Sequence, residues 1–214
     1  MKMKVLIASG PTREPIDAVR YLSNYSTGYM GAALAREARR RGHRVTVVSG
    51  PVSEPLPAGV RRVSIERAAD LARALRREAP RADAIVMAAA VADFRPVRRT
   101  AGKLRRAGRL TLCLAPTPDV IAGLPVRPGQ VRAGFAIESR SVPARAGRKL
   151  REKRLDLVLA QRSEPTGAPF GRRPIRAWLL ERGCAAEPLG RIGKPEAARR
   201  LFGRIEALWR LRHP

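Results

Sequence analysis

The stretch that decides the fold is Ser9–Gly31, SGPTREPIDAVRYLSNYSTGYMG. A short apolar run, Val5–Ala8, precedes it and predicts a buried strand, and a helical pattern that carries Leu34 and Ala38 follows it. A strand, a loop and a helix that starts beside glycine are the parts with which α/β proteins present backbone N–H groups to an anion. The loop is longer and more polar than a plain connector needs to be. We therefore expect it to bind an anionic ligand.

The composition indicates a soluble globular chain of one domain. Its 214 residues can bury a sizeable core, and 44% hydrophobic with 29% charged residues are ordinary proportions. The longest apolar runs, such as Ala84–Ala92, are much shorter than a membrane span, and Met1–Lys4 leaves no room for the apolar segment of a signal peptide. Cys113 and Cys184 fit a reducing cytosol better than a disulfide scaffold. The sequence therefore predicts a cytoplasmic protein without a membrane anchor.

The net charge of +26 does not by itself indicate a nucleic-acid-binding protein. The arginines are spread over nearly all helices and loops, aromatic residues make up only 4%, and no known nucleic-acid-binding motif is present. We expect nucleic acid to bind non-specifically at most. A positive field does raise the local concentration of small anionic substrates.

Apolar strands and amphipathic helices alternate along the chain. This alternation predicts an α/β fold with a doubly wound, mostly parallel, Rossmann-like sheet in a single domain over residues 1–214. Ligands of such sheets bind beyond the carboxyl ends of the strands, where the opening loop and Ala90–Phe94 fall. The predicted strands are Val5–Ala8, Val45–Ser49, Val60–Ile65, Asp83–Ala90 at the centre, Val131–Ala136, Leu155–Ala160 and, as the last, Ile175–Leu180, and the predicted helices are Tyr29–Arg41, Ala68–Arg77, Pro143–Arg154 and one that starts at Pro195.

Residues 96–116 interrupt this alternation. They are basic, contain several glycines and end with alternating leucines, which predicts a flap hairpin that leaves the sheet. Thr117 then fits the N-cap of a short helix with Pro118 in its first turn. Residues 161–173 are predicted to form a loop.

Several common active-site chemistries are excluded. The chain has no P-loop, and the glycines after its first strand do not form the dinucleotide-binding fingerprint. Its two histidines, His43 and His213, have no metal-ligand spacing. A zinc site or a histidine-based nucleophile triad is not expected.

The few lysines stand out in a chain whose basic residues are mostly arginines. The 44 basic residues include only Lys2, Lys4, Lys103, Lys149, Lys153 and Lys194. A lysine in such a chain can mark a place that requires a compact point charge. Lys149 and Lys153 lie four residues apart on one helix face, and with Lys103 on the flap they could converge on a polyphosphate. The alternative is that all three are ordinary surface lysines.

Two further polar residues allow either a functional or a structural interpretation. Asp93, after the central strand, can hold a ribose or a base by accepting hydrogen bonds, or it can cap a turn. The Asn24 amide can stabilise a developing oxyanion, but asparagine is also common in turns.

Several motifs occur in the order found in one known family. They are GPTREPIDAVRYLSNYSTG at Gly10–Gly28, VSGP at Val48–Pro51, AAVADFRP at Ala89–Pro96, KLRR at Lys103–Arg106, TPDVIA at Thr117–Ala122, GFAIES at Gly134–Ser139, and the Lys149/Lys153 pair before LDLVLA. Over essentially its whole length the chain resembles the phosphopantothenate–cysteine ligase (phosphopantothenoylcysteine synthetase) family of coenzyme A biosynthesis.

The resemblance implies a ligation in two steps. CTP, or ATP in some members, activates the carboxylate of 4′-phosphopantothenate as an acyl-nucleotide, and L-cysteine then displaces the nucleotide to form an amide. Mg²⁺ and protein cations would bear the phosphate charge. The family also implies a homodimer to whose assembly the flap contributes. Bifunctional relatives carry a flavin-dependent decarboxylase domain before this one, so FMN is not expected here, and a separate decarboxylase is a possible partner.

The resemblance also implies roles for individual residues. Asn24 would stabilise the activated acyl group with Arg20 nearby, and Lys103, Lys149 and Lys153 would contact the phosphates. No protein ligand is assigned to a metal. The nucleotide would also contact Met87, Ala88, Ala89, Asp93, Pro118, Asp119, Val120, Ile121 and Phe135, and the substrate loop would use Gly10, Ser23, Ser26, Thr27 and Gly28.

The chain departs from the family pattern at the edges of this site. Tyr29 stands where lysine is frequent, Gln161–Arg162 replaces a common Asn-Asp, and Arg172–Pro174 replaces an acidic and amide pattern. How the loop after Ala160 completes the site and what Tyr29 does are open at this point.

Two rival functions remain alternatives. A nucleotide-binding oxidoreductase could use the same kind of sheet, but the missing glycine fingerprint counts against it. A basic nucleic-acid-binding protein would bind duplexes in a salt-dependent way and would not need the Ser9–Gly31 loop.

Overall fold

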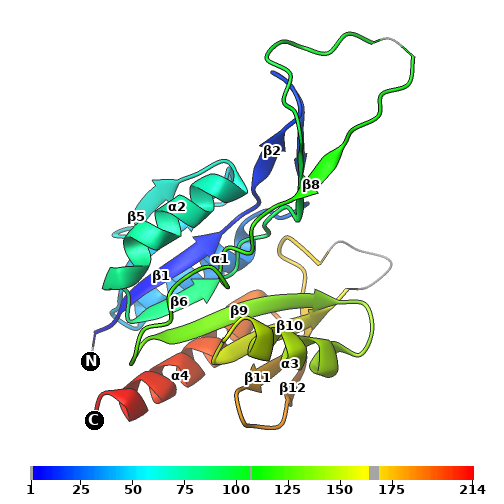
Figure 1. The fold of residues 1–214 in the computed structure, drawn as a ribbon. Coiled ribbons are helices and arrows are strands. Elements are labelled where there is room, and N and C mark those ends of the chain that lie inside the picture. The colour runs from blue at the N-terminus through cyan, green and yellow to red at the C-terminus, as the bar shows by residue number, and fades with distance from the viewer. Residues whose placement is uncertain (1, 107, 164–168) are drawn as a thin grey trace.

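The computed structural model describes residues 2–106, 108–163 and 169–214, which form one eight-stranded sheet with helices on both faces (Figure 1). Its strands are β1 (Lys4–Ser9), β4 (Arg44–Ser49), β5 (Arg61–Ser64), β6 (Ala84–Met87), β9 (Val131–Glu138), β10 (Leu157–Arg162), β11 (Ile175–Glu181) and β12 (Glu187–Ile192). Their order across the sheet is β12-β11-β10-β9-β6-β1-β4-β5.

The prediction of a mostly parallel sheet is confirmed. All strands from β5 across to β10 run parallel, and only β11 and β12 are antiparallel to their neighbours. β6 lies between β1 and β9 near the centre, where Asp83–Ala90 was expected. It ends earlier than predicted, at Met87, and beyond it Ala90 makes an isolated bridge with Pro11.

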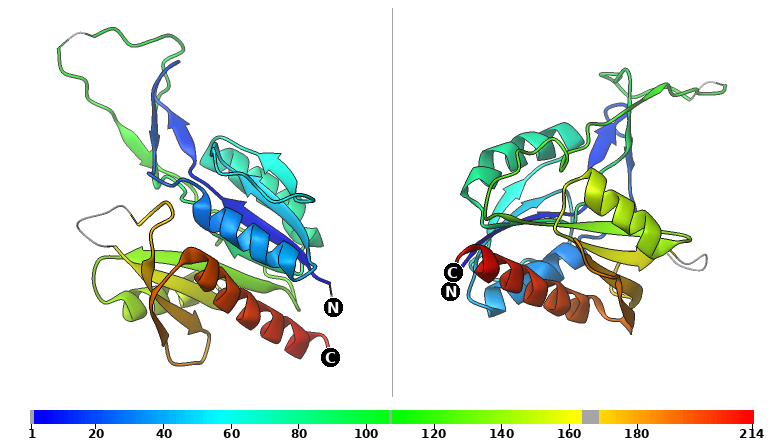
Figure 2. Two further views of the ribbon diagram at one scale, coloured as in Figure 1. Left: turned by 180° about the vertical axis from the view of Figure 1, so that it is seen from behind. Right: turned by 60° about the horizontal axis from the view of Figure 1, so that its bottom comes forward.

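Two helices cover each face of the sheet, so that it is doubly wound as predicted (Figure 2). The helices are α1 (Tyr29–Arg40) and α4 (Lys194–Arg212) on one face and α2 (Ala68–Glu78) and α3 (Val142–Glu152) on the other. Side chains of a strand point alternately to the two faces. In β1, Val5 and Ile7 therefore pack in one core, and Leu6 and Ala8 pack in the other. None of the helices in the described ranges is long and apolar enough to cross a membrane.

Two sets of strands were not predicted. The opening loop contains a small hairpin, β2 (Arg13–Pro15) with β3 (Tyr21–Ser23), whose three-residue strands are too short for an apolar pattern to reveal them. The prediction that Ile175–Leu180 is the last strand is wrong, because β12 follows it. β12 reads EPLGRI, and its proline and glycine are poor strand formers.

The short helix predicted after Thr117 is also wrong. The structure has a turn over residues 120–123 instead. Thr117 Oγ1 donates to the Ala92 carbonyl at 2.6 Å, so this side chain does not cap a helix. Asp119 Oδ1 accepts from the Ala122 N–H at 3.2 Å and closes the turn.

The predicted flap hairpin is confirmed at its base. There β7 (Phe94–Pro96) pairs antiparallel with β8 (Leu114–Pro116). The Thr100 N–H donates to the Ile16 carbonyl at 3.0 Å and so joins the flap to the β2–β3 hairpin. Both hairpins project from the same end of the molecule (Figure 2).

Candidate active site

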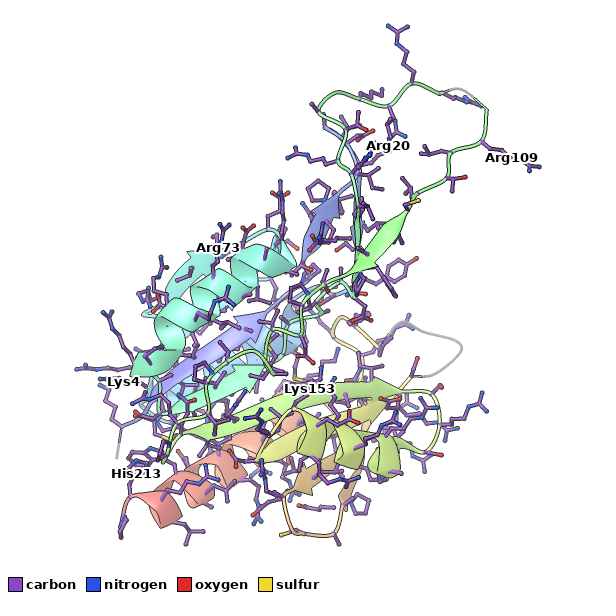
Figure 3. The ribbon with its side chains drawn as sticks, viewed as in Figure 1. Lys4, Arg20, Arg73, Arg109, Lys153 and His213 are labelled. Atoms are coloured by element: carbon purple, nitrogen blue, oxygen red, sulfur yellow. The ribbon has the colours of Figure 1, made fainter. Side chains whose placement is uncertain are left out.

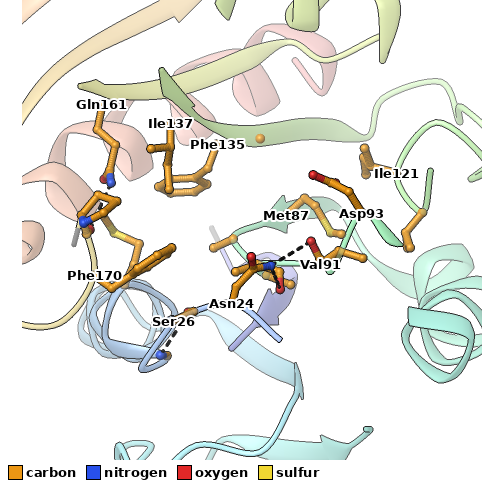
Figure 4. Close-up of a pocket in the computed structure, with 18 of the residues that line it drawn as sticks. Asn24, Ser26, Met87, Val91, Asp93, Ile121, Phe135, Ile137, Gln161 and Phe170 are labelled. Atoms are coloured by element: carbon orange, nitrogen blue, oxygen red, sulfur yellow. Dashed lines mark hydrogen bonds between the residues drawn. The ribbon is translucent and has the colours of Figure 1, made fainter. Parts of the chain in front are cut away.

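A cleft of about 560 Å³ lies where the carboxyl ends of β1, β6, β9 and β10 meet (Figure 4). This is the edge at which doubly wound sheets bind their ligands. It gathers residues of the opening loop with residues that follow β6, the flap and β10. The expected site residues that line it are Asn24, Ser26, Thr27, Gly28, Met87, Ala88, Ala89, Asp93, Pro118, Asp119, Val120, Ile121, Phe135, Lys149 and Lys153.

Backbone hydrogen bonds fix the opening loop to the segment after β6. The Thr12 N–H donates to the Ala90 carbonyl at 3.2 Å, and Thr12 Oγ1 accepts from the Ala92 N–H at 2.9 Å. At the start of α1, a Cβ on Gly31 would lie 1.9 Å from Ser9 Oγ. Only glycine allows α1 to start this close to the end of β1.

Asn24 connects the two sides of the cleft. Its Nδ2 donates to the carbonyls of Ala90 and Val91, each at 3.0 Å (Figure 4). The two acceptors occupy both amide protons, and the atom left for a ligand is Oδ1, which can only accept. A donor role toward an oxyanion would require Nδ2 to leave one of these two carbonyls.

A buried arginine holds the turn that carries Pro118–Ile121. Arg132, on β9, is 1% exposed, and its guanidinium donates to the carbonyls of Ile121 and Leu124. Neither interaction was foreseen, because the partners are backbone atoms outside the strand. The wall expected to bind the nucleotide is thereby attached to the centre of the sheet.

The two helical lysines face the cleft, at the C-terminal end of α3. Lys153 Nζ lies 3.0 Å from Asp119 Oδ2. Burial lowers the pKa of Lys149, and the charge of Lys153 lowers it further. Burial alone would raise the pKa of Asp119, but the hydrogen bond from Lys153 brings it below its usual value. A phosphate group near these lysines would exchange one anionic partner for another.

Four expected site residues lie outside the cleft lining: Arg20, Lys103, Gly10 and Ser23. Arg20 lies near the far end of the projecting hairpin, away from Lys153 (Figure 3). Its Nη2 donates to the Leu104 carbonyl on the flap at 2.7 Å, and its Nε lies 3.3 Å from Asp17 Oδ2. Lys103 is exposed on the flap. Ser23 Oγ donates to the Thr12 carbonyl at 2.7 Å and so stabilises the loop itself.

The cleft also contains residues that were not assigned to it. Tyr29 lines it, and the guanidinium groups of Arg36 and Arg172 lie 5.6 and 5.1 Å from the centre of the Tyr29 ring. Lys194 lines it too, and its only signal in the sequence was its rarity as a lysine. The remaining additions are Met30, Ala90, Val91, Thr117, Gly134, Ile137, Leu155, Gln161, Pro169, Phe170 and Gly171.

The predicted loop over residues 161–173 is partly a strand, because β10 continues to Arg162. Residues 164–168 of it lie outside the described residues. Phe170 reaches the cavity from this segment, and Phe135 reaches it from β9 (Figure 4). The altered segment after β10 thus forms part of the cleft wall.

Comparisons with known proteins agree with the fold of this chain. A family model described as the DNA/pantothenate metabolism flavoprotein C-terminal domain matches residues 1–208. The crystal structure of the C-terminal domain of the coenzyme A biosynthesis bifunctional protein CoaBC superimposes with a TM-score of 0.80 and 31% identity, covering 96% of this chain and 95% of that one.

Two relatives extend beyond the matched region. The CoaBC protein of Vibrio vulnificus (strain YJ016) is 40% identical over 173 residues, which are 78% of this chain and 43% of that protein. A cysteine/cysteine sulfinic acid decarboxylase from an unknown prokaryotic organism is 34% identical over 209 residues, 96% of this chain and 58% of that protein. The chain therefore covers only about half the length of each.

Proposed function

The chain belongs to the phosphopantothenate–cysteine ligase family, whose domain model is that of the DNA/pantothenate metabolism flavoprotein C-terminal domain, and from this premise we propose that it joins 4′-phosphopantothenate to L-cysteine. The product is phosphopantothenoylcysteine, an intermediate of coenzyme A biosynthesis.

The proposed reaction has two steps. A carboxylate oxygen of 4′-phosphopantothenate attacks the α-phosphorus of the nucleoside triphosphate, and pyrophosphate leaves. The amine of L-cysteine then attacks the activated carbonyl carbon and loses a proton, and the nucleoside monophosphate leaves. A free carboxylate is a poor electrophile, so the first step supplies the leaving group that the second step needs.

The observation that carries this proposal is the contact between the opening loop and the segment after β6. Asn24 Nδ2 lies 3.0 Å from the carbonyls of Ala90 and Val91, so a group bound at the loop lies next to a group bound along Met87–Asp93. The first step requires a carboxylate oxygen close to the α-phosphorus, and holding both reactants in one cleft supplies that proximity.

The charges around the cleft suit anionic substrates. Lys149 and Lys153 would bind the phosphates, and the net charge of +26 would draw the nucleotide and 4′-phosphopantothenate to the protein.

Among the described residues no group of three His, Cys, Asp or Glu side chains could hold a metal ion. Mg²⁺ typically binds through substrate phosphates and one or two carboxylates. Of the described residues that line the cleft, Asp93 and Asp119 carry carboxylates, and these two would bind such an ion, which neutralises phosphate charge.

We further propose a homodimer in which the flap takes part. Phe94 and Leu110 are 54% and 58% exposed, and a second copy would cover them. Arg20 and Lys103 would reach the reacting groups only if the flap moved or if a second copy supplied them.

The test is a pyrophosphate-release assay with CTP and ATP in parallel, because the sequence does not decide between them. Release should require 4′-phosphopantothenate, and L-cysteine should be consumed in step with it. If neither nucleotide released pyrophosphate in the presence of both substrates, the proposal would be wrong.

A further inference from the structure

Lys194 occupies an unfavourable position for a lysine. It is the first residue of α4, where the helix dipole disfavours a positive charge, and it is 3% exposed. Burial lowers the pKa of Lys194 to about 8. A buried ammonium group persists only where hydrogen bonds replace its hydration.

Two backbone carbonyls supply those hydrogen bonds. Lys194 Nζ donates to the Pro169 carbonyl at 3.1 Å and to the Gly171 carbonyl at 2.6 Å. Gln161, which is 4% exposed, donates from Nε2 to the same Pro169 carbonyl at 3.1 Å. The two carbonyls belong to the residues on either side of Phe170, so the ammonium group holds the backbone that carries this ring.

The outer side of the same segment is held more weakly. Arg172 lies 3.4 Å from Glu54 and above the Tyr29 ring, but its side chain is 75% exposed. Exposed ion pairs and exposed cation–π contacts each contribute little to stability. The buried contacts of Lys194 are therefore the stronger attachment of this wall.

We propose that Lys194 is a positioning residue of the cleft, which holds the backbone of Pro169 and Gly171 and thereby sets the place of the Phe170 ring in the wall. Its effect on catalysis rests on the proposed ligase function, whereas its effect on the segment does not. The ring faces the cavity together with Ile137 and with Phe135, which is among the residues expected to contact the nucleotide (Figure 4). Loss of Lys194 should therefore weaken nucleotide binding more than it slows the chemical steps.

The kinetic test compares Lys194→Met with Lys4→Met, an exposed lysine on β1 (Figure 3). Methionine fills a similar volume but cannot donate. Hydrogen bonds from a charged group contribute about 1.5–3 kcal/mol, so Lys194→Met should raise the nucleotide KM about tenfold or more while kcat changes less than about threefold. Lys4→Met should change neither value. An unchanged KM in folded Lys194→Met protein would overturn the proposal.

A double-mutant cycle tests whether Lys194 acts through the ring. In a Phe170→Ala background, Lys194→Met should cause no further rise of the nucleotide KM, because the ring that it positions is gone. Effects that multiply would show instead that Lys194 contacts the ligand independently, and the positioning role would be wrong.

A measurement without substrate separates this proposal from the proposed function. Hydrogen exchange of a peptide covering residues 169–174 should become faster in Lys194→Met than in wild type and Lys4→Met, while peptides from β1 and β6 stay unchanged. Faster exchange in a protein without ligase activity would support the positioning role and contradict only the function. Unchanged exchange would contradict the positioning role whatever the activity.

Discussion

Two segments that line the cleft are held by different buried cations. The segment over residues 117–124, which contains the turn, is held by Arg132, and the segment over residues 169–172 is held by Lys194. In both cases the cation donates to backbone carbonyls. Arg132 projects from the middle of the sheet, whereas Lys194 begins a helix.

The two attachments differ in how the charge of the cation responds to pH. Burial lowers the pKa of Arg132, but an arginine starts from so high a value that it stays charged, and its planar fork fixes two directions at once. Lys194 is a point charge whose pKa is about 8. The wall formed by residues 117–124 (the Arg132 wall) should therefore be held equally well at any ordinary pH. The attachment of residues 169–172 (the Lys194 wall) should change in strength within the pH range of ordinary assays.

The largest expected effect is the loss of the Arg132 wall. Arg132→Met leaves the buried carbonyls of Ile121 and Leu124 without these donors and should lower the free energy of unfolding by about 3 kcal/mol. For a chain of this size the melting temperature should fall by roughly 6–12 °C. Urea denaturation measures the change, with exposed Arg73→Met as the control. A loss below about 1 kcal/mol would mean that other donors replace the guanidinium.

Asn24→Ala tests the residue that lies between the two walls. It should slow amide formation about 100-fold, equivalent to about 2.7 kcal/mol, while acyl-nucleotide formation falls less. Both walls keep their cations in this variant, so their stability should be retained. Rapid-quench measurement of the two half-reactions checks this, and an equal loss in both would contradict a role for Asn24 in the second step.

The pH dependence of stability should separate the two cations. Because folding lowers the pKa of Lys194 to about 8, the folded state releases a proton that the unfolded state keeps up to its ordinary pKa. The cost of burying the ammonium is complete below pH 8 and is relieved as the pH rises toward about 10.4. Between about pH 7 and 9, wild type should gain about 1 kcal/mol relative to Lys194→Met. Wild type should show no such gain relative to Arg132→Met, because both of these proteins keep Lys194. Equal pH profiles of the free energy of unfolding for the two variants would contradict the difference between the two cations.

The smallest effect is expected at the exposed edge of the Lys194 wall. Arg172→Ala and Tyr29→Leu remove the contact between this segment and α1, which exposure makes weak. The nucleotide KM should change less than about threefold in each, as measured by steady-state kinetics. A tenfold rise in Arg172→Ala would mean that the outer contact, and not Lys194, positions Phe170.

The sequence predicted the parts of the fold that long apolar patterns encode. The parallel strands, the four helices α1 to α4 and the position of the cleft followed from these patterns, and the order of the motifs identified the family. The β2–β3 hairpin and β12 were missed because their strands are very short or contain proline and glycine. Neither pattern nor resemblance indicated the roles of Arg132 and Lys194, since each bonds to backbone carbonyls that become neighbours only in the folded chain.

Transfer of ¹⁸O tests the central claim, that this cleft forms an acyl-nucleotide, most directly. 4′-Phosphopantothenate labelled with ¹⁸O in its carboxylate is incubated with the nucleoside triphosphate, L-cysteine and the protein. The released nucleoside monophosphate is then examined by mass spectrometry. Each monophosphate should carry one ¹⁸O atom from the carboxylate. If ¹⁸O appeared in inorganic phosphate, or if the amide accumulated while the monophosphate carried no ¹⁸O, the formation of an acyl-nucleotide would be contradicted.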